Sequence, residues 1–328
     1  MPNGSVYYRC ILPLSLIKGA VAGRPRFNTS QGFGVEDGTA HGRYGFDTVV
    51  LKLLMHKQTP KQMEAAKKIG QRLIVDVDDY YPGLHESNLA FKSTDPSRKG
   101  WNRDHYAASI LLADTVTVTT PFLHDYYTQI HPDVRLIRNG IERSLLPRRP
   151  TYNRKPVIGW MGATSWRSND LEILRDWMPQ FLEEHDLMFH HSGHHPSSPV
   201  AADLIGIPHE RCSVSQMVPI NRLSTLMCFD IGLVPLADIP FNHAKSNLKG
   251  LEYAISGIPY VASALPEYQR LANEGIGRVA VTPDHWIEEL TALLGRRNAL
   301  NESQRNYTRV KRDHTIDSHR DEWLAALT

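Results

Sequence analysis

Residues Phe229–Ser263 read FDIGLVPLADIPFNHAKSNLKGLEYAISGIPYVAS, and this stretch decides the fold. A β-rich run, Asp230–Leu236, is followed by a loop and then by an amphipathic segment that Gly257 ends. A second apolar run, Pro259–Ser263, comes directly after this turn. The order of strand, helix and strand predicts one repeat of an alternating β/α sheet whose strands run parallel.

The helix in this stretch is expected to begin at a cap residue, Asn242 or Ser246. At about 100° per residue, its polar stripe consists of Lys245, Lys249, Glu252 and Ser256. The adjacent apolar stripe, which can pack on a sheet, consists of Leu248, Leu251 and Ile255. Ammonium groups near a helix N-terminus attract phosphates, and a carboxylate accepts hydrogen bonds from ribose hydroxyls. The polar stripe therefore indicates a site for an anion that carries a sugar, and a solvated helix face is the alternative.

Length and composition are those of an ordinary globular protein. The 328 residues are enough for two domains, and 41% hydrophobic and 22% charged residues are usual values. The net charge of +2 does not indicate a polyanion-binding protein, although basic residues cluster in Arg143–Lys155 and Arg296–Arg312. The three cysteines form no CxxC pair, and no apolar run reaches membrane-spanning length. We therefore expect a cytoplasmic protein without a transmembrane segment.

The first part of the chain alternates strands and helices after an unusual start. A helix-like run, Val6–Lys18, stands where such domains usually have a strand, and Gly4–Ser5 is either a phosphate-facing turn or a helix cap. We predict that Gly19–Arg43 is a loop with at most a short strand near Ala20–Phe27. The elements expected after it are Phe46–Leu54, Pro60–Ile69, Arg72–Val77, Trp101–Leu112, Thr115–Thr119, Pro121–Ile130 and Val134–Ile137.

Carboxylates gather at the carboxyl end of the strand Arg72–Val77. Asp76, Asp78 and Asp79 lie where ligands bind in a doubly wound sheet. Clustered carboxylates shift one another's pKa, which suits acid–base catalysis or metal binding. The alternative is that they form a turn or cap before the loop Tyr80–Asn88.

A second alternating half follows Ile141–Pro156, which is rich in Pro and Arg and is interpreted as an interdomain linker. Its elements before the opening stretch are Val157–Trp160, Asn169–Glu184, Leu187–His191, Arg211–Met217 and Asn221–Met227. Those after it are Pro266–Glu274, Gly277–Val281, Pro283–Leu294 and Glu302–Leu327. We place a first domain at residues 1–146 and a second at 147–300, and we expect residues 301–328 to form a helix that crosses back to the first domain.

Four histidines surround Ser192–Gly193, and a metal site is one interpretation of them. They are His190, His191, His194 and His195. Their spacing lacks an HExxH helix or the paired ligands of a zinc module, so we predict no metal. A strand-end loop beside a nucleotide is the preferred interpretation.

Three segments together make the chain similar to the GT-B class of nucleotide-sugar glycosyltransferases, closest to the family-4-like retaining group. They are Val134–Glu142 (VRLIRNGIE), Val157–Leu171 (VIGWMGATSWRSNDL) and Asp230–Ser263. Asp76–Tyr80, which precedes Leu84–Asn88, also resembles a subgroup whose strand ends in a D-x-DD pattern. The resemblance extends from Phe46 to Val281 and implies two Rossmann-like α/β domains facing a cleft.

The resemblance also implies roles for the matching positions. Glu252 would hold the ribose hydroxyls, while Lys245 and Lys249 would contact the diphosphate together with backbone N–H groups near Ser246. The residues that would approach the phosphates from the other strand end are Gly162, Thr164 and Arg167. Those that would lie near the base or the ribose are His190, Ser192 and Gly193.

The chain departs from the family pattern in two places. The family carries two glutamates separated by seven residues, and Glu252 fits the second of them, but Ala244 stands at the first. Lys245 and Ser246 occupy that neighbourhood instead. The usual first strand and its glycine-rich loop are represented only by Gly4–Ser5.

The implied function is transfer of a sugar from a nucleoside-diphosphate sugar, with retention and without a metal or other cofactor. Lys245, Lys249 and Arg167 would stabilise the leaving diphosphate. Asp78 and Asp79 would position the acceptor, or one of them would be the general base of an inverting enzyme. The acceptor-side residues are then Gly4, Ser5, Asp76, Asp78 and Asp79. A protein, a lipid-linked glycan, a small molecule and a modified nucleobase all fit as acceptors, and the oligomeric state is left open.

Other functions fit parts of the pattern. Asp76-Val77-Asp78 matches the DxD metal–diphosphate motif of the other glycosyltransferase fold, but that assignment leaves the phosphate-ready second half unexplained. A nucleotide-sugar epimerase or hydrolase could use the same scaffold. The incomplete glutamate pair also allows a non-catalytic module, for example one that binds nucleic acid through Arg143–Lys155 or Arg296–Arg312.

Overall fold

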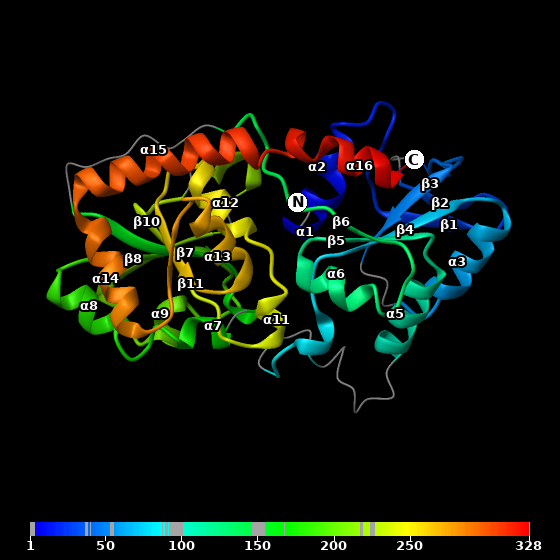
Figure 1. Cartoon of the computed structure of the whole chain (residues 1–328). Coiled ribbons are helices and arrows are strands. Elements are labelled where there is room, and N and C mark those ends of the chain that lie inside the picture. Colours follow the sequence, from blue (N-terminus) through cyan, green and yellow to red (C-terminus); the bar gives the residue numbers. More distant parts are fainter. Residues whose placement is uncertain are drawn as a thin grey trace.

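The computed structural model has two α/β halves that lie side by side, each built on a parallel sheet (Figure 1). It describes residues 4–36, 39, 41–52, 56–86, 88, 91, 101–145, 155–166, 168–216, 219–223 and 227–327. No helix within these ranges is both long enough and apolar enough to span a bilayer.

The first sheet has four parallel strands in the order β3-β4-β5-β6. They are β3 (Thr48–Leu51), β4 (Arg72–Val77), β5 (Thr115–Val118) and β6 (Val134–Leu136). The helices that connect them are α3 (Thr59–Lys68), α5 (Trp101–Leu112) and α6 (Pro121–Tyr127). The strands are rich in Val, Ile, Leu and Thr, which suits strands that are covered on both faces. The predicted alternation of this half is confirmed.

The second sheet has six parallel strands in the order β12-β11-β10-β7-β8-β9. They are β7 (Val157–Met161), β8 (Met188–His194), β9 (Cys212–Gln216), β10 (Ile231–Val234), β11 (Tyr260–Ser263) and β12 (Arg278–Ala280). The chain builds outward from β7 through β8 and β9, and then restarts on the other side with β10. This reversal creates a topological switch point between β7 and β10, where doubly wound sheets bind their ligands.

The helices of the second half include α9 (Ala201–Ile205), α13 (Pro266–Asn273) and α14 (Pro283–Leu294).

The prediction of a single long helix over Asn169–Glu184 is wrong. The structure has α7 (Ser168–Glu172) and, after a turn, α8 (Met178–Glu184). Pro179 lies in the first turn of α8, where its missing N–H costs nothing, whereas inside one long helix it would break a hydrogen bond.

The helix of the opening stretch is also divided, into α11 (Pro240–His243) and α12 (Leu248–Ile255). The predicted polar stripe is therefore wrong at both ends, because Lys245 lies in the turn before α12 and Ser256 follows its last residue and is buried. Lys249 and Glu252 lie on α12 as predicted, and the apolar residues Leu251 and Ile255 are buried.

The N-terminal segment is helical but ends earlier than predicted. It consists of α1 (Gly4–Val6), a π-helix (Tyr7–Ile11) and α2 (Leu12–Leu14). The predicted loop Gly19–Arg43 is partly wrong, since β1 (Pro25–Asn28) and β2 (Gly32–Val35) form an antiparallel hairpin. Gly32 begins β2 with φ +74°, a conformation that side chains rarely allow. The two strands are too short for their alternation to stand out in the sequence.

Two crossings of the chain between the halves lie side by side. Ile141, leaving the first half, forms a parallel bridge with Thr315 of the returning segment. A Cβ on Gly140 would lie 2.6 Å from the Ile316 Cα, so this close approach requires glycine. The helix predicted over Glu302–Leu327 is in fact two helices. The structure has α15 (Arg296–Asp313), which packs along α12, and α16 (Arg320–Leu327).

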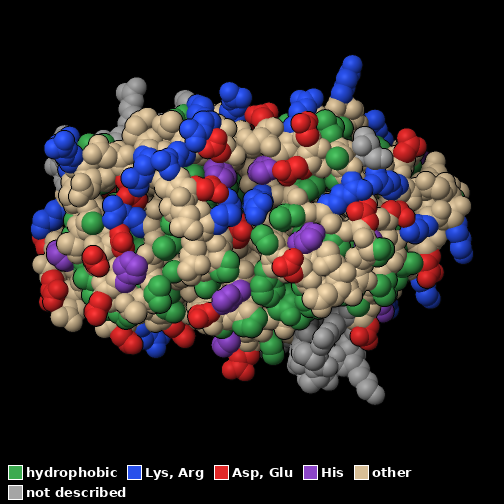
Figure 2. All heavy atoms as spheres, in the orientation of Figure 1, with side chains coloured by type: hydrophobic (Ala, Val, Ile, Leu, Met, Phe, Trp, Pro, Cys, Tyr) green, Lys and Arg blue, Asp and Glu red, His purple; other side chains and the backbone are tan. Residues whose placement is uncertain are grey.

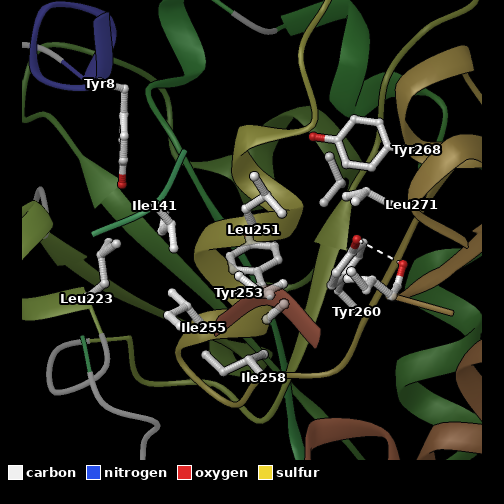
Figure 3. Close-up of a cluster of buried hydrophobic side chains, with 14 of the residues drawn as sticks. Tyr8, Ile141, Leu223, Leu251, Tyr253, Ile255, Ile258, Tyr260, Tyr268 and Leu271 are labelled. Atoms are coloured by element: carbon white, nitrogen blue, oxygen red, sulfur yellow. Dashed lines mark hydrogen bonds between the residues drawn. The ribbon is translucent and has the colours of Figure 1, made fainter. Parts of the chain in front are cut away.

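The predicted return of the C-terminal helix to the first half is confirmed by α16, which lies beside α2 (Figure 1). The ring of Trp323 on α16 lies 4.7 Å from the guanidinium of Arg9 in the N-terminal segment. A buried apolar cluster extends from these elements to α12 and joins Tyr8, Ile141, Leu251 and Ile255 (Figure 3). The N-terminal segment is thus packed against both halves.

Candidate active site

Gly162, Gly193 and Lys249 meet at the switch point of the second sheet. Gly162 follows β7, and a Cβ there would lie 2.7 Å from the Trp160 ring and 3.3 Å from the Lys249 Nζ. Gly193 in β8 has φ +97°, and a Cβ on it would lie 3.1 Å from the Gly162 carbonyl oxygen. Both glycines therefore let two strand ends and a lysine approach closely, which is how such sheets make room for a phosphate.

Lys249 lies in the first turn of α12, on the sheet's carboxyl side. Its Nζ donates to the Met161 carbonyl and lies 5.0 Å from the centre of the Trp160 ring. The positive end of the helix and the ammonium group reinforce each other electrostatically. This corner is therefore suited to a negatively charged group.

Glu252 lies one turn further along α12 and is partly buried. Its Oε1 accepts a hydrogen bond of 3.0 Å from the Tyr8 hydroxyl. Burial raises the pKa of Glu252 above its ordinary value, although the charge of Lys249 and the Tyr8 hydrogen bond act in the opposite direction. Sequence reasoning had no signal for Tyr8, because 244 positions separate it from its partner.

Lys245 and Ser246 lie at the junction of the two halves. Lys245 forms an ion pair with Asp79, and its Nζ lies 4.3 Å from the centre of the Phe241 ring. The Ser246 Oγ accepts a hydrogen bond of 2.9 Å from the Asn139 side chain at the end of the first sheet. The turn before α12 therefore contacts the carboxylate corner predicted in the first half.

The three aspartates of that corner lie in different surroundings. Asp76 is 3% exposed, and its oxygens accept from Arg9, Lys52 and Thr117. Asp78 accepts from Ser5 and forms an ion pair of 2.7 Å with Lys52. Asp76 is therefore enclosed within the first half. The less buried Asp78 and Asp79 lie nearer the junction.

Arg9 and Lys52 hold this corner together and were not predicted from the sequence. Burial raises the pKa of Asp76, but the charges of Arg9 and Lys52 outweigh it and lower the pKa from 3.8 to about 2. Burial lowers the pKa of Lys52, and Asp76 and Asp78 more than compensate, so it stays above 10.5. Arg9 also donates to the Ile137 carbonyl at 2.7 Å. These ionised side chains fix the N-terminal segment on the sheet.

The other described donor-side candidates with polar side chains, Thr164, His190 and Ser192, form hydrogen bonds within the protein. The Thr164 Oγ1 donates to the Pro199 carbonyl at 2.7 Å. His190 hydrogen bonds with Ser213 at 2.8 Å and Ser215 at 3.0 Å, and Ser215 also donates to Ser192. These contacts shape the strand ends beside the switch point. Arg167 lies outside the described residues.

His191 also has a fixed role beside Gly162. Its Nδ1 accepts from the Ala201 N–H at 3.2 Å, so its Nε2 carries the proton donated to the Gly162 carbonyl at 3.0 Å. Burial lowers the pKa of His191, which favours this neutral ring. Among the described residues, no three His, Cys, Asp or Glu side chains are arranged to hold a metal ion.

Asp170, which sequence reasoning did not select, shapes the loop after β10. It is buried, and its Oδ1 accepts from the Ala237 N–H at 3.0 Å and from the Asn242 side chain at 2.6 Å. It thereby sets the path of the chain toward α12. The only sequence signal was its place at the end of the segment Val157–Leu171.

No family model and no curated protein sequence matches this chain. Solved structures do match it, among them sucrose-phosphate synthase from Thermosynechococcus elongatus, with a TM-score of 0.61 and 14% identity over 86% of this chain and 72% of the other. HepE from Anabaena in complex with UDP-glucose matches with a TM-score of 0.61 and 11% identity over 86% of this chain and 78% of its own. The pneumococcal O-GlcNAc transferase GtfA, in complex with UDP and GlcNAc, has a TM-score of 0.57 and 14% identity over 85% of this chain and 56% of its own.

The chain has the GT-B fold. It spans 72% of the synthase chain but only 56% of the GtfA chain. The first half carries Asp78 and Asp79, and the second half carries Gly162, Lys249 and Glu252. The contacts of Lys245 with Asp79 and of Ser246 with Asn139 join the two halves.

Proposed function

We propose that this protein is a glycosyltransferase that takes a sugar from a nucleoside-diphosphate sugar held by the second half. The observation that carries the proposal is the meeting of Gly162, Gly193 and Lys249 at the strand ends beside the switch point, with Glu252 one turn further along α12. A diphosphate fits beside Lys249 and the start of α12, and ribose hydroxyls fit the Glu252 carboxylate. We place this donor domain at residues 147–300 and the acceptor domain at residues 1–146.

In the proposed reaction, the bond between the anomeric carbon and the diphosphate breaks as an acceptor oxygen bonds to that carbon. Lys249 and the α12 N-terminus stabilise the negative charge of the departing diphosphate. The acceptor proton passes to the departing phosphate oxygen, which gives retention without a separate base. Asp78 and Asp79 position the acceptor. A product with the opposite anomeric configuration to the donor would contradict retention.

We also propose that the reaction needs no divalent metal, because fixed cations are available to neutralise the leaving group. Lys245 is one of them once a ligand draws it from Asp79. Loss of turnover in EDTA, restored by manganese, would contradict this. Release of the sugar without any acceptor would instead favour a hydrolase.

The nucleic-acid-binding alternative rests on two basic segments, Arg143–Lys155 and Arg296–Arg312. Most of the first lies outside the described residues, and the second lies in the helix α15, along which Figure 2 shows Lys and Arg side chains. Two of these arginines bind the segment after α13. Arg305 donates to the Gly275 carbonyl at 3.0 Å, and Arg309 donates to the Glu274 carbonyl. These contacts favour a structural role for α15, so the donor site remains our proposal. Strongly salt-dependent DNA binding without turnover would reverse it.

The proposal predicts that a nucleoside diphosphate or its sugar raises the melting temperature, with UDP and UDP-glucose the first probes. At a concentration about 100 times Kd, the rise should be on the order of 5 °C. Glu252→Gln should remove most of this rise because the ribose loses its carboxylate acceptor. A thermal-shift panel measures both effects.

Glu142→Gln is the matched control, since Glu142 accepts from a tyrosine of the same N-terminal segment, Tyr7, at 2.5 Å. It should keep the full nucleotide response. The proposal is wrong if no nucleotide stabilises the wild-type protein, or if Glu252→Gln responds like the wild type.

A further inference from the structure

The N-terminal segment reaches into the candidate donor site through one hydroxyl group. Tyr8 belongs to the π-helix Tyr7–Ile11, and its hydroxyl donates to Glu252 Oε1 at 3.0 Å. A residue near the start of the sequence therefore contacts the carboxylate of the candidate donor site, 244 positions further along the chain. π-Helical turns are rare and frequently lie at functional sites.

We propose that Tyr8 is a positioning residue that orients Glu252 for the ribose of the nucleotide. The inference rests on the proposed function, because it assigns Glu252 to the ribose. A carboxylate has two oxygens that accept hydrogen bonds. Tyr8 is the only described residue that donates to this carboxylate, and it uses Oε1, so Oε2 is left for a ligand hydroxyl.

Tyr8 is itself held rigidly, which a positioning residue requires. It is 1% exposed and packs in the cluster that includes Leu12 and Leu251, with its ring extending from the N-terminal segment toward Ile141 (Figure 3). The next residue, Arg9, anchors the segment on Asp76 with hydrogen bonds of 2.7 to 3.2 Å. The hydroxyl is thus fixed in space relative to both halves.

The hydroxyl also keeps its proton under all ordinary conditions. Burial raises the pKa of Tyr8 well above 10, and the charge of Glu252 raises it further. Tyr8 is therefore always a donor, and the oxygen that it contacts is always the acceptor. This fixes the rotation of the Glu252 carboxylate in the absence of ligand.

Tyr7 provides a matched control within the same segment. Its hydroxyl donates to Glu142 Oε2 at 2.5 Å, so Tyr7→Phe removes a tyrosine–carboxylate hydrogen bond of the same kind. Glu142 lies in the segment that leaves the first half and has no part in the proposed ribose contact. A change found in Tyr8→Phe but not in Tyr7→Phe therefore reports on Glu252.

The test is calorimetric titration of UDP and 2′-deoxy-UDP into the wild type, Tyr8→Phe and Tyr7→Phe. Tyr8→Phe should weaken UDP binding about 10-fold. It should also reduce the preference for UDP over the deoxy form, because a misaligned carboxylate forms a weaker hydrogen bond with the 2′-hydroxyl. Tyr7→Phe should keep both values within about twofold of the wild type.

Each outcome decides a different claim. Equal UDP affinity and equal 2′-hydroxyl preference in Tyr8→Phe and the wild type would overturn the role of Tyr8 while leaving the donor site intact. A wild type that binds neither nucleotide would overturn the uridine donor and the role of Tyr8 together. Melting curves of both variants verify that they are folded. Should Tyr8→Phe not fold, the crystal structure of the wild type with bound UDP decides instead: the inference requires that Tyr8 still donates to Glu252 Oε1, and loss of that hydrogen bond would overturn it.

Discussion

Arg9→Met should lower the free energy of unfolding by about 3–5 kcal/mol, the cost of removing one partner from a buried ion pair. Arg9 is 1% exposed and donates to Asp76, to the Ile137 carbonyl and to Asn139. Without it, Lys52 is the one charged partner that Asp76 keeps among the described residues. Urea unfolding of the two proteins measures the difference.

Arg312→Met is the matched control, because Arg312 pairs with Asp313 on the exposed face of α15. Surface pairs contribute little, so this variant should unfold like the wild type. Equal stability of Arg9→Met and Arg312→Met would contradict the account of the N-terminal segment.

The ion pair of Arg9 and Asp76 also predicts how the stability of the protein depends on pH. Because the pKa of Asp76 is lowered from 3.8 to about 2, its contribution to stability is complete above pH 3.8 and is lost as the pH falls toward 2. Arg9→Met removes the first of the charges that lower the pKa of Asp76, so less stability should be lost between pH 3.8 and 2, and the loss should end at a higher pH than in the wild type. Unfolding curves collected between these limits measure how much stability each protein loses.

Lys249→Met should lower kcat by about 10²–10³-fold, the usual effect of removing one donor that stabilises charge in a transition state. The Nζ of Lys249 lies at the end of β7, where it donates to the Met161 carbonyl beside Gly162. The lost charge matters most when the diphosphate departs, so kcat should fall more than donor affinity. The readout is release of nucleoside diphosphate from the sugar nucleotide that the thermal-shift panel identifies.

Lys311→Met is the control for this variant, since Lys311 lies on α15 and donates to the Tyr307 hydroxyl at 2.8 Å. Its kcat should remain within about twofold of the wild type. An unchanged kcat in Lys249→Met would place the leaving group elsewhere.

The second half was the more predictable part of the molecule. Local signals suffice for it: Asp230–Leu236 reads as a strand, Gly257 ends a helix, and Lys249 and Glu252 fall on one face of that helix. Strands that alternate with helices also allow few sheet topologies. The GT-B resemblance, carried by the same segments, agrees with the observed fold.

The junction of the halves was not predictable in the same way. Lys245 was placed on the helix because its spacing fits, but two short helices bring it instead to Asp79. Asp76 was grouped with Asp78 and Asp79 by sequence adjacency, whereas β4 turns Asp76 toward Arg9 in the interior. The Lys245–Asp79 and Arg9–Asp76 ion pairs each join residues that lie far apart in the chain.

We propose that a nucleoside diphosphate binds at the switch point between β7 and β10. A crystal structure of the protein soaked with UDP tests it most directly. We expect ribose hydroxyls on Glu252, with Oε1 still bound to Tyr8, and the diphosphate within hydrogen-bond distance of the Lys249 Nζ. A nucleotide bound instead at Asp78 and Asp79 through a divalent ion would contradict it.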